Sequence, residues 1–368
     1  MARLAATGRT PLQWYANRSA YTPQNLGMNY PWLNNHAGGS VINYLTTQYN
    51  STLVENDLAL IASWGVKIIR AWGQLESVMD WTGNAYTINT TYAANLDDFL
   101  TRCANHNLQV ILVIGDGKSS GGYSNLDGKF RWTFVNSSST YLSALYTYVN
   151  HFKAHANILM WELQNEPYAN LTWSDNAITS GVTQAQLHEF LVSCYSVVKV
   201  IVGSTYVGFS DYEEEQQNVY QLFSNATKRT NLVDDCTDVY SMHIYRADQW
   251  QIADFRNLTG KPKWCSEVGS YNYSDPTGVS HGNQPGYNEL MSDGPNGISG
   301  ISNPYSTRSI AAKLINSGFS LILPWSIGDN DSVVRHLSDG SHIVGSLGAW
   351  IQAQFNATRT LASGRQLV

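Results

Sequence analysis

Charged side chains are scarce in this 368-residue chain, at 14% of residues, and they are scattered along it. No run of Lys and Arg is typical of a nucleic-acid surface, and no basic amphipathic segment is typical of a membrane surface. No run of apolar residues reaches the length that we expect of a membrane span. The composition therefore predicts neither nucleic acid nor membrane as a partner.

Cysteine is also sparse, and its spacing excludes the paired CxxC pattern of a structural zinc site. The four cysteines are Cys103, Cys194, Cys236 and Cys265. An even number permits two disulfides but fixes no pairing, and buried free thiols are the alternative. No other metal-ligand cluster and no nucleotide-binding motif stands out, so we expect no metal and no cofactor.

The first ten residues, MARLAATGRT, lack the apolar segment of a secretory signal. N-x-[ST] sequons nevertheless occur at ten positions, roughly twice the number that chance would give. Their number predicts a secreted, extracellular glycoprotein, and the alternative is an Asn/Ser/Thr-rich surface without glycans. The sequons begin at Asn17, Asn50, Asn89, Asn136, Asn170, Asn225, Asn257, Asn272, Asn330 and Asn356.

Linkers rich in proline, glycine or serine are absent from most of the chain, which indicates a single domain over residues 1–368, and we expect a monomer. Hydrophobic residues make up 43% of the chain, enough for a large core. The 12 Trp and 22 Tyr residues suit either that core or a site for the flat faces of sugars.

Eight short apolar runs recur along the chain, and continuous runs of this kind are typical of strands buried on both faces. Helical spacing lies between them, as in residues 52–65, 92–107 and 183–199. In the first of these, one face carries Leu53, Leu58, Ile61 and Trp64, and Gly65 ends the helix. The runs cover residues 25–30, 65–72, 108–115, 157–163, 199–209, 238–245, 262–269 and 319–328.

Eightfold strand–helix alternation predicts an α/β fold, the (β/α)₈ barrel. A doubly wound open sheet is the alternative, but it calls for a Gly-rich turn after the first strand, and NLGMNYPW has none. The long Gly/Asn/Ser/Pro stretch at 270–304 follows the seventh strand, so a barrel would place it as a loop at the active-site mouth.

Polar and aromatic groups stand at the ends of six of these runs, where a barrel builds its active site. Burying ionised groups costs several kcal/mol each, so two glutamates, an arginine and a histidine at strand ends indicate a site rather than a core. The groups are Asn29 and Trp32, Arg70 and Trp72, Asn165 and Glu166, His243 and Tyr245, Glu267, and Trp325.

Glu166 and Glu267 supply the two carboxylates that hydrolysis of a glycosidic bond requires. The ordered set also resembles the retaining glycoside hydrolases of clan A, and family 5 in particular. The resemblance spans residues 12–355. It rests on Asn165-Glu166-Pro167 in the fourth run, His243-Ile244-Tyr245 in the sixth, Glu267-Val268-Gly269 in the seventh, and Arg70 and Trp325 in the second and eighth.

The resemblance implies a role for each of these side chains. Glu166 would be the general acid and later the base, and Glu267 would be the nucleophile. Asn165 would hold the 2-hydroxyl of the sugar, and Trp325 would form the floor of its subsite. Arg70 and Tyr245 would flank Glu267 and keep it ionised, and His243 would orient the same network.

A third acid, Glu162, stands in the fourth run, and we expect it to pair with a basic group inside the barrel.

Finer motifs resemble those of family 5 β-mannanases: RAWG after the second run, WELQNEP at 161–167 and HIYRADQW at 243–250. They imply that Trp72 and Trp250 line sugar subsites. The function expected is a retaining endo-β-1,4-mannanase acting on polysaccharide. The alternatives are a β-1,4-glucanase (cellulase) and a non-catalytic carbohydrate-binding barrel.

Overall fold

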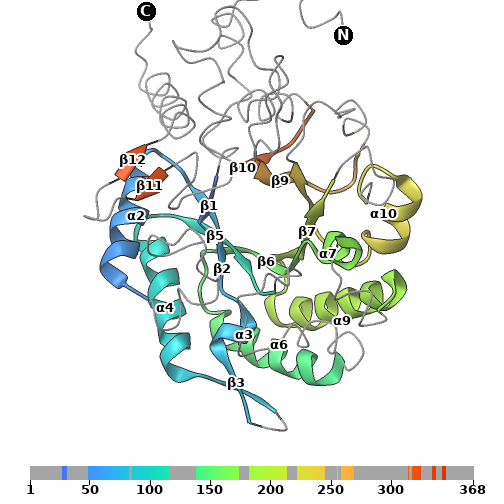
Figure 1. Ribbon diagram of the computed structural model, residues 1–368, viewed down its shortest axis with the longest axis horizontal. Coiled ribbons are helices and arrows are strands. Elements are labelled where there is room, and N and C mark those ends of the chain that lie inside the picture. Colours follow the sequence, from blue (N-terminus) through green and yellow to red (C-terminus); the bar gives the residue numbers. More distant parts are fainter. Residues whose placement is uncertain are drawn as a thin grey trace, which may run out of the picture.

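A computed structural model gives the architecture of the chain (Figure 1). The structure describes residues 27–30, 49–82, 85–115, 138–173, 182–213, 222–244, 255, 258–268, 314, 317–324, 334–336 and 342–344. The loop expected at 270–304 lies outside these residues, so its place at the mouth stays a prediction.

Eight parallel strands form one sheet in the order β1-β2-β5-β6-β7-β8-β9-β10. The first and last strands also meet, because the Gly27 amide donates to the Ile322 carbonyl oxygen at 2.9 Å. The (β/α)₈ barrel predicted from the sequence is confirmed. Its strands are β1 (Met28–Tyr30), β2 (Ile68–Trp72), β5 (Gln109–Val113), β6 (Ile158–Asn165), β7 (Tyr206–Tyr212), β8 (Tyr240–Ile244), β9 (Lys263–Val268) and β10 (Leu321–Pro324).

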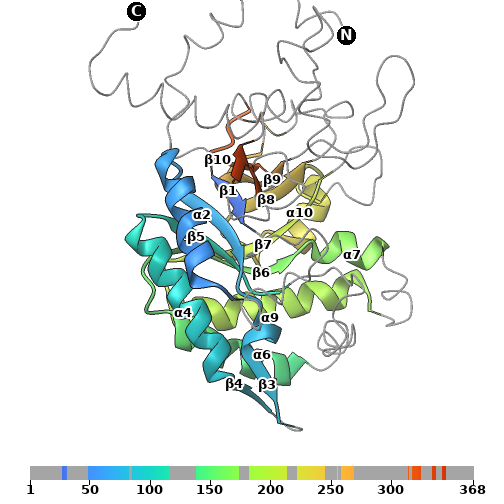
Figure 2. The same ribbon diagram turned by 60° about the vertical axis from the view of Figure 1, so that its left-hand side comes forward.

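Helices surround the strands on the outside of this sheet (Figures 1 and 2). The three predicted helices appear as α2 (Ser51–Ser63), α4 (Thr90–Asn105) and α9 (Gln184–Val202), and α6 (Ser138–Phe152), α7 (Pro167–Trp173) and α10 (Ala226–Leu232) join them. Gly65 adopts a φ of 88° just beyond α2, as its predicted stop position requires. Leu53, expected on the buried face, is partly exposed, and Val54 takes a buried place instead.

Small elements complete the fold. The short helix α3 (Leu75–Val78) follows β2, and β3 (Met79–Trp81) pairs antiparallel with β4 (Tyr86–Ile88). A second antiparallel pair joins β11 (Val334–His336) and β12 (His342–Val344).

Three of the sequon asparagines begin helices. The side-chain oxygens of Asn50, Asn89 and Asn225 accept backbone amides in the first turns of α2, α4 and α10. Asn is among the best N-cap residues, so helix capping alone accounts for an asparagine at these three positions. Glycosylation and secretion stay predictions.

The fifth strand begins later than the apolar run at 199–209 predicts. Residues 199–202 complete α9, and β7 begins only at Tyr206. Val198, Val200 and Val202 favour a strand by composition, but the capping box at Thr183 and Gln186 starts a helix that continues through them.

The same helix corrects the expectation about long apolar segments. By length and composition alone α9 could cross a membrane. In this fold it packs against α6, β6 and β7, which is the place of a barrel helix.

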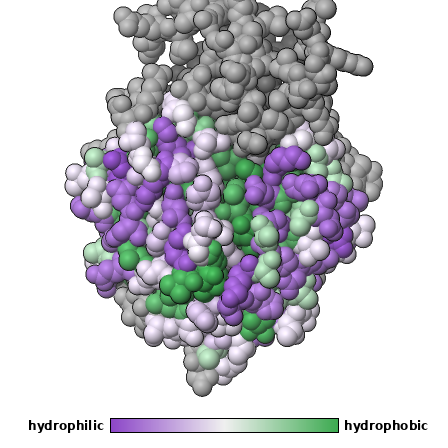
Figure 3. Space-filling model, turned by 180° about the vertical axis from the view of Figure 1, so that it is seen from behind, coloured by the Kyte–Doolittle hydropathy of each residue, from purple (hydrophilic) through white to green (hydrophobic). Residues whose placement is uncertain are grey.

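Seen from behind, the described surface is mainly polar, with hydrophobic residues gathered in limited areas (Figure 3).

Two hydrophobic clusters lie on opposite faces of the sheet. The larger fills the layer between strands and helices, and its buried residues include Leu58, Phe99 and Phe152. The smaller one fills the barrel interior, and all its members are at most 8% exposed: Ile68, Ile111, Met160, Val239, Trp264, Leu321 and Leu323.

The four cysteines are buried free thiols, so the disulfide alternative is wrong for this structure.

Truncating Ile111, which is fully buried inside the barrel, should lower the free energy of unfolding by about 2–5 kcal/mol, because the cavity cannot collapse between closed strands. Denaturant unfolding of Ile111→Ala measures this. Val200→Ala is the control: Val200 is 85% exposed, and its truncation should change stability by less than about 0.5 kcal/mol. Equal effects from both variants would contradict a packed interior.

Candidate active site

Arg70 lies at the centre of a polar layer above the small interior cluster. It is fully buried, and its guanidinium donates to oxygens from three strands: Asn29 on β1, Glu162 and Asn165 on β6, and Glu267 on β9. Burial lowers the pKa of Arg70, but the attraction of Glu162 and then of Glu267 outweighs it, so the pKa is raised overall. The guanidinium is therefore a permanent positive charge at the barrel mouth.

Glu162 pairs with Arg70 through both carboxylate oxygens. Nε donates to Oε2 at 2.7 Å and Nη2 donates to Oε1 at 2.5 Å, with neither side chain exposed. This bidentate geometry is the strongest form of such a pair. The prediction that Glu162 pairs with a basic group inside the barrel is confirmed.

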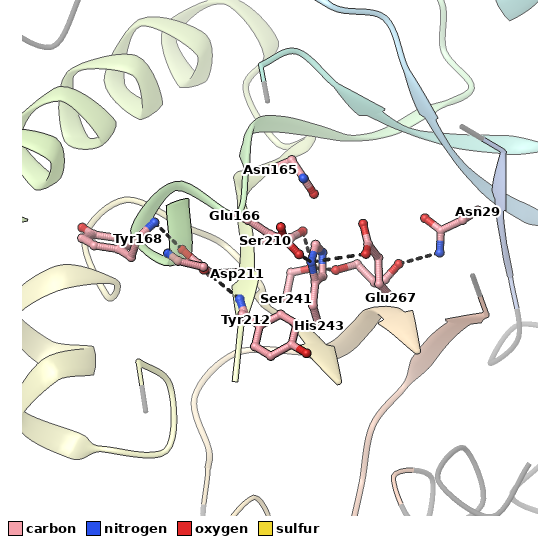
Figure 4. A network of polar contacts seen from close by, with 12 residues as sticks. Asn29, Asn165, Glu166, Tyr168, Ser210, Asp211, Tyr212, Ser241, His243 and Glu267 are labelled. Atoms are coloured by element: carbon pink, nitrogen blue, oxygen red, sulfur yellow. Dashed lines mark hydrogen bonds and ion pairs between the residues drawn. The ribbon is translucent and has the colours of Figure 1, made fainter. Parts of the chain in front are cut away.

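Glu166 and Glu267 face each other across this layer (Figure 4). One oxygen of each carboxylate and a ring nitrogen of His243 all lie within 4.8 Å of one another. His243 Nδ1 lies 2.7 Å from Glu166 Oε1 and 3.5 Å from Glu267 Oε2, while Arg70 Nη1 donates to Glu267 Oε1 at 2.6 Å. The two acids thus differ in environment: Glu267 contacts the Arg70 guanidinium, whereas the shortest of these contacts of Glu166 is with the imidazole of His243.

The backbone at Glu166 is unusual, with a φ of 50° in a non-glycine residue. Such a conformation costs of order 1–3 kcal/mol and persists only where the surroundings hold it. Neighbouring strands do so: the Asn165 amide donates to the Gly115 carbonyl and the Glu166 amide donates to the Ser210 carbonyl, at 2.8 and 2.7 Å. The turn ends β6 and aims the Glu166 carboxylate into the barrel mouth.

A row of hydroxyl groups within the next strands gave no signal in the sequence. Ser210, Ser241 and Ser266, on β7, β8 and β9, are joined through their Oγ atoms at 2.9 and 2.8 Å. All three are buried, and the carbonyl of Ser266 accepts the Asn29 side-chain amide at 2.8 Å. Serine is common everywhere in this chain, so composition gave no signal for this chain of hydroxyls.

Two buried acids at the end of β7 were missed as well. Asp211 accepts the amides of Tyr168, Ala169 and Tyr212. Glu213 accepts the amides of Phe223 and Ser224, and burial raises its pKa to about 7 despite these bonds. The strand assigned to 199–209 stopped short of both residues; a strand continued to 212 would have put Asp211 at its end.

The other predicted site residues divide into two groups. Asn165 Oδ1 accepts from Arg70 Nη2 at 2.6 Å, and Trp72, only 2% exposed, lies with its ring centroid 4.4 Å from the Arg70 guanidinium carbon. Trp72 thus packs against Arg70 in this structure, and its contact with sugar stays a prediction. Trp32, Tyr245, Trp250 and Trp325 lie outside the described residues.

Two groups in the described part of the chain bring three potential metal ligands within 4.8 Å. The first is Glu166, His243 and Glu267. The second is His188, Asp235 and Cys236, where burial raises the pKa of the Cys236 thiol and disfavours the thiolate that a metal would need.

Two carboxylates that face each other at the mouth of a (β/α)₈ barrel are the groups that hydrolysis of a glycosidic bond requires. Residues 33–273 match the family model described as "Cellulase (glycosyl hydrolase family 5)". The chain belongs to this family and is a glycoside hydrolase. No curated protein matches it.

Solved structures share the fold at low sequence identity. An exo-β-1,4-mannosidase, Op5Man5 from Opitutaceae bacterium strain TAV5, is 15% identical with a TM-score of 0.62, over 91% of this chain and 60% of that one. The β-mannanase of the blue mussel Mytilus edulis is 17% identical with a TM-score of 0.51, over 82% and 86%. A family 1 β-glucosidase of Exiguobacterium antarcticum B7 is 11% identical with a TM-score of 0.61, over 92% and 99%.

Replacing Arg70 by Met should lower the free energy of unfolding by about 3–5 kcal/mol at pH 7, because Glu162 and Glu267 would remain buried without their cation. Lowering the pH neutralises carboxylates that are buried without a cation, so the deficit should shrink as the pH falls from 7 toward about 4. Denaturant unfolding at pH 7 and pH 4 measures both effects.

Arg102→Met is the matched control for this substitution. Arg102 also contacts two carboxylates, Asp98 at 2.7 Å and Glu55 at 2.8 Å, but its side chain is 26% exposed. Its loss should cost about 1 kcal/mol or less. If Arg70→Met were no more harmful than Arg102→Met, the buried cation would not be holding the acids.

Proposed function

We propose that the protein is a retaining endo-β-1,4-mannanase. The observation that carries the retaining mechanism is the separation of Glu166 and Glu267, whose closest carboxylate oxygens lie within 4.8 Å. Retaining enzymes hold their carboxyl groups about 5–5.5 Å apart, whereas inverting enzymes leave about 6.5–9.5 Å for a water molecule. The short gap supports direct attack by one carboxylate on the sugar.

In the first step, Glu267 attacks the anomeric carbon while Glu166 gives its proton to the departing glycosidic oxygen. Arg70, 2.6 Å from Glu267, favours the ionised form that a nucleophile requires. The carbon–oxygen bond to the leaving sugar breaks as the glycosyl–Glu267 ester forms. His243, 2.7 Å from Glu166, orients the acid.

In the second step, the ionised Glu166 takes a proton from water, and the resulting hydroxide attacks the same carbon. Glu267 leaves as a carboxylate, and Arg70 stabilises the charge that returns to it. Asn165, held through Oδ1 by Arg70, is placed beside the acid to contact the 2-hydroxyl of the reacting sugar. Two inversions give net retention.

The choice of mannan is supported by sequence motifs. Arg70-Ala71-Trp72, Trp161-Glu162-Leu163 and the stretch at 243–250 resemble patterns of β-mannanases. Solved structures with mannanase in their names share the fold, but at 13–17% identity they support the fold alone. A β-1,4-glucanase is the second candidate, because the matching family model is itself described as cellulase.

We further propose that the enzyme works as an extracellular monomer, and the ten sequons support export.

Removing either carboxylate should abolish most turnover. Glu267→Ala should lose several orders of magnitude in kcat, because no nucleophile remains. Glu166→Gln should lose a comparable amount on natural polysaccharide, whose leaving group needs a proton. Steady-state kinetics measure both, and NMR of the first-formed sugar should show the β-anomer. A first-formed α-anomer would refute retention.

Release of reducing ends from mannan, glucomannan and carboxymethyl-cellulose tests the substrate. A mannanase should be most active on mannan and glucomannan, with an early fall in viscosity typical of internal cleavage. Preference for carboxymethyl-cellulose would favour the glucanase. If the protein bound these polysaccharides but released reducing ends from none of them, the result would favour a non-catalytic carbohydrate-binding barrel.

A further inference from the structure

Asp211 follows Ser210 on β7, and because side chains alternate along a strand the two face opposite ways. Ser210 joins the hydroxyl chain inside the barrel, so Asp211 points outward against α7. It is 1% exposed. Its three contacts are all backbone amides, and no cation contacts it among the described residues.

Those amides include the first turn of α7, the helix that begins directly after Glu166. Asp211 Oδ2 accepts the Tyr168 amide at 2.6 Å and Oδ1 accepts the Ala169 amide at 3.1 Å. In most helices the residue at the N-cap supplies this oxygen from its own side chain. Glu166 occupies that position here, but its carboxylate is engaged with His243. Asp211 supplies the missing cap from the neighbouring strand.

The end of β7 therefore holds Glu166 on both sides. The Ser210 carbonyl accepts the amide of Glu166 itself, and Asp211 accepts the next two free amides of the chain. In Figure 4, Asp211 lies between Tyr168 and Tyr212, on the side of Glu166 away from Glu267. This clamp accounts for the survival of a φ of 50° at Glu166.

Charge adds a second effect. Burial raises the pKa of Asp211, and the charge of Glu166 raises it further. All three of its contacts are nevertheless amide donors, a geometry that suits a carboxylate and offers no acceptor to a carboxylic O–H, so we take Asp211 as ionised. An electrostatic interaction of this kind is mutual, so an ionised Asp211 disfavours the ionised form of Glu166. Among the described residues, the other ionisable groups whose contacts bring them near Glu166 are His243 on β8, Glu267 on β9 and, through Glu267 and Asn165, Arg70 on β2.

We propose that Asp211 is a positioning residue, which clamps the turn at Glu166 and whose negative charge keeps Glu166 protonated to higher pH. The inference rests on the acid/base role of Glu166 proposed above. It assigns to β7 a part in the catalytic cycle although Asp211 touches neither the substrate nor the reacting atoms.

Asp211→Asn removes the charge and one acceptor, and it tests both effects. We expect kcat to fall about ten- to a hundredfold with KM changed less than about threefold. The alkaline limb of the kcat/KM profile should move down by about one pH unit, because Glu166 would lose its proton more easily. Asp211→Ser keeps an uncharged hydrogen-bond acceptor and should give the same shift. It replaces Asp211→Asn in the experiment if that variant does not fold.

The control is Asp57→Asn, another buried acid (3% exposed), which accepts the Tyr30 hydroxyl at 2.5 Å on the outer side of the barrel. It should lower stability and leave the pH profile in place. An unmoved limb in both Asp211 variants would overturn the proposal, as would an equal shift in Asp57→Asn.

A carbon-13 titration of the labelled glutamate carboxyls, with Glu166 assigned by Glu166→Gln, gives a readout without turnover. The Glu166 carboxyl signal should have its titration midpoint at lower pH in Asp211→Asn than in the wild type. If the wild type were inactive on all three polysaccharides but showed this shift, the proposed function would be refuted and the clamp upheld. An active wild type without the shift would refute the clamp alone.

Discussion

One buried guanidinium holds the mouth of this barrel together. Arg70 donates to Asn29, Glu162, Asn165 and Glu267, so β1, β6 and β9 are joined through a side chain of β2. Arg70 with Glu162 and Glu267 carries a net charge of −1 when both acids are ionised. Glu162 takes one side of the guanidinium in a bidentate pair, and Glu267 is held through a single nitrogen at 2.6 Å. Glu267, the proposed nucleophile, is thereby positioned, while its second oxygen lies 3.5 Å from His243.

Much of this arrangement could be predicted from the sequence, because buried parallel strands are continuous apolar runs and their ends collect at one mouth. The eight runs gave the barrel, and the polar residues that end them gave Arg70, Glu166, His243 and Glu267. Glu162 was placed correctly because a lone acid in a buried strand requires a cation. The inferences about these polar residues rest on the cost of burying a charged group, which can be judged from a single strand without knowing which strands are its neighbours.

The rest depended on information that is not local. Val198 to Val202 resemble a strand by composition, but α9 had already begun at its capping box and continued through them. Its place near the end of β7 was the one sign of Asp211, and its partners gave none, since they are backbone amides of residues 168, 169 and 212, and any residue type except proline supplies an amide. The hydroxyl chain of Ser210, Ser241 and Ser266 depends on the register between three strands, which the strand assignments alone do not supply.

The side chain of Asn29 has a consequence for when the enzyme becomes competent. Its Nδ2 donates to the carbonyls of Ser266 and Leu323, which are 237 and 294 positions away, and its Oδ1 accepts from Arg70. The carbonyl of Ser266 belongs to the residue just before Glu267, so the first strand can brace it only after more than two thirds of the chain has been made. The Leu323 contact comes later still, so a nascent fragment that ends before β10 lacks part of the bracing around Glu267.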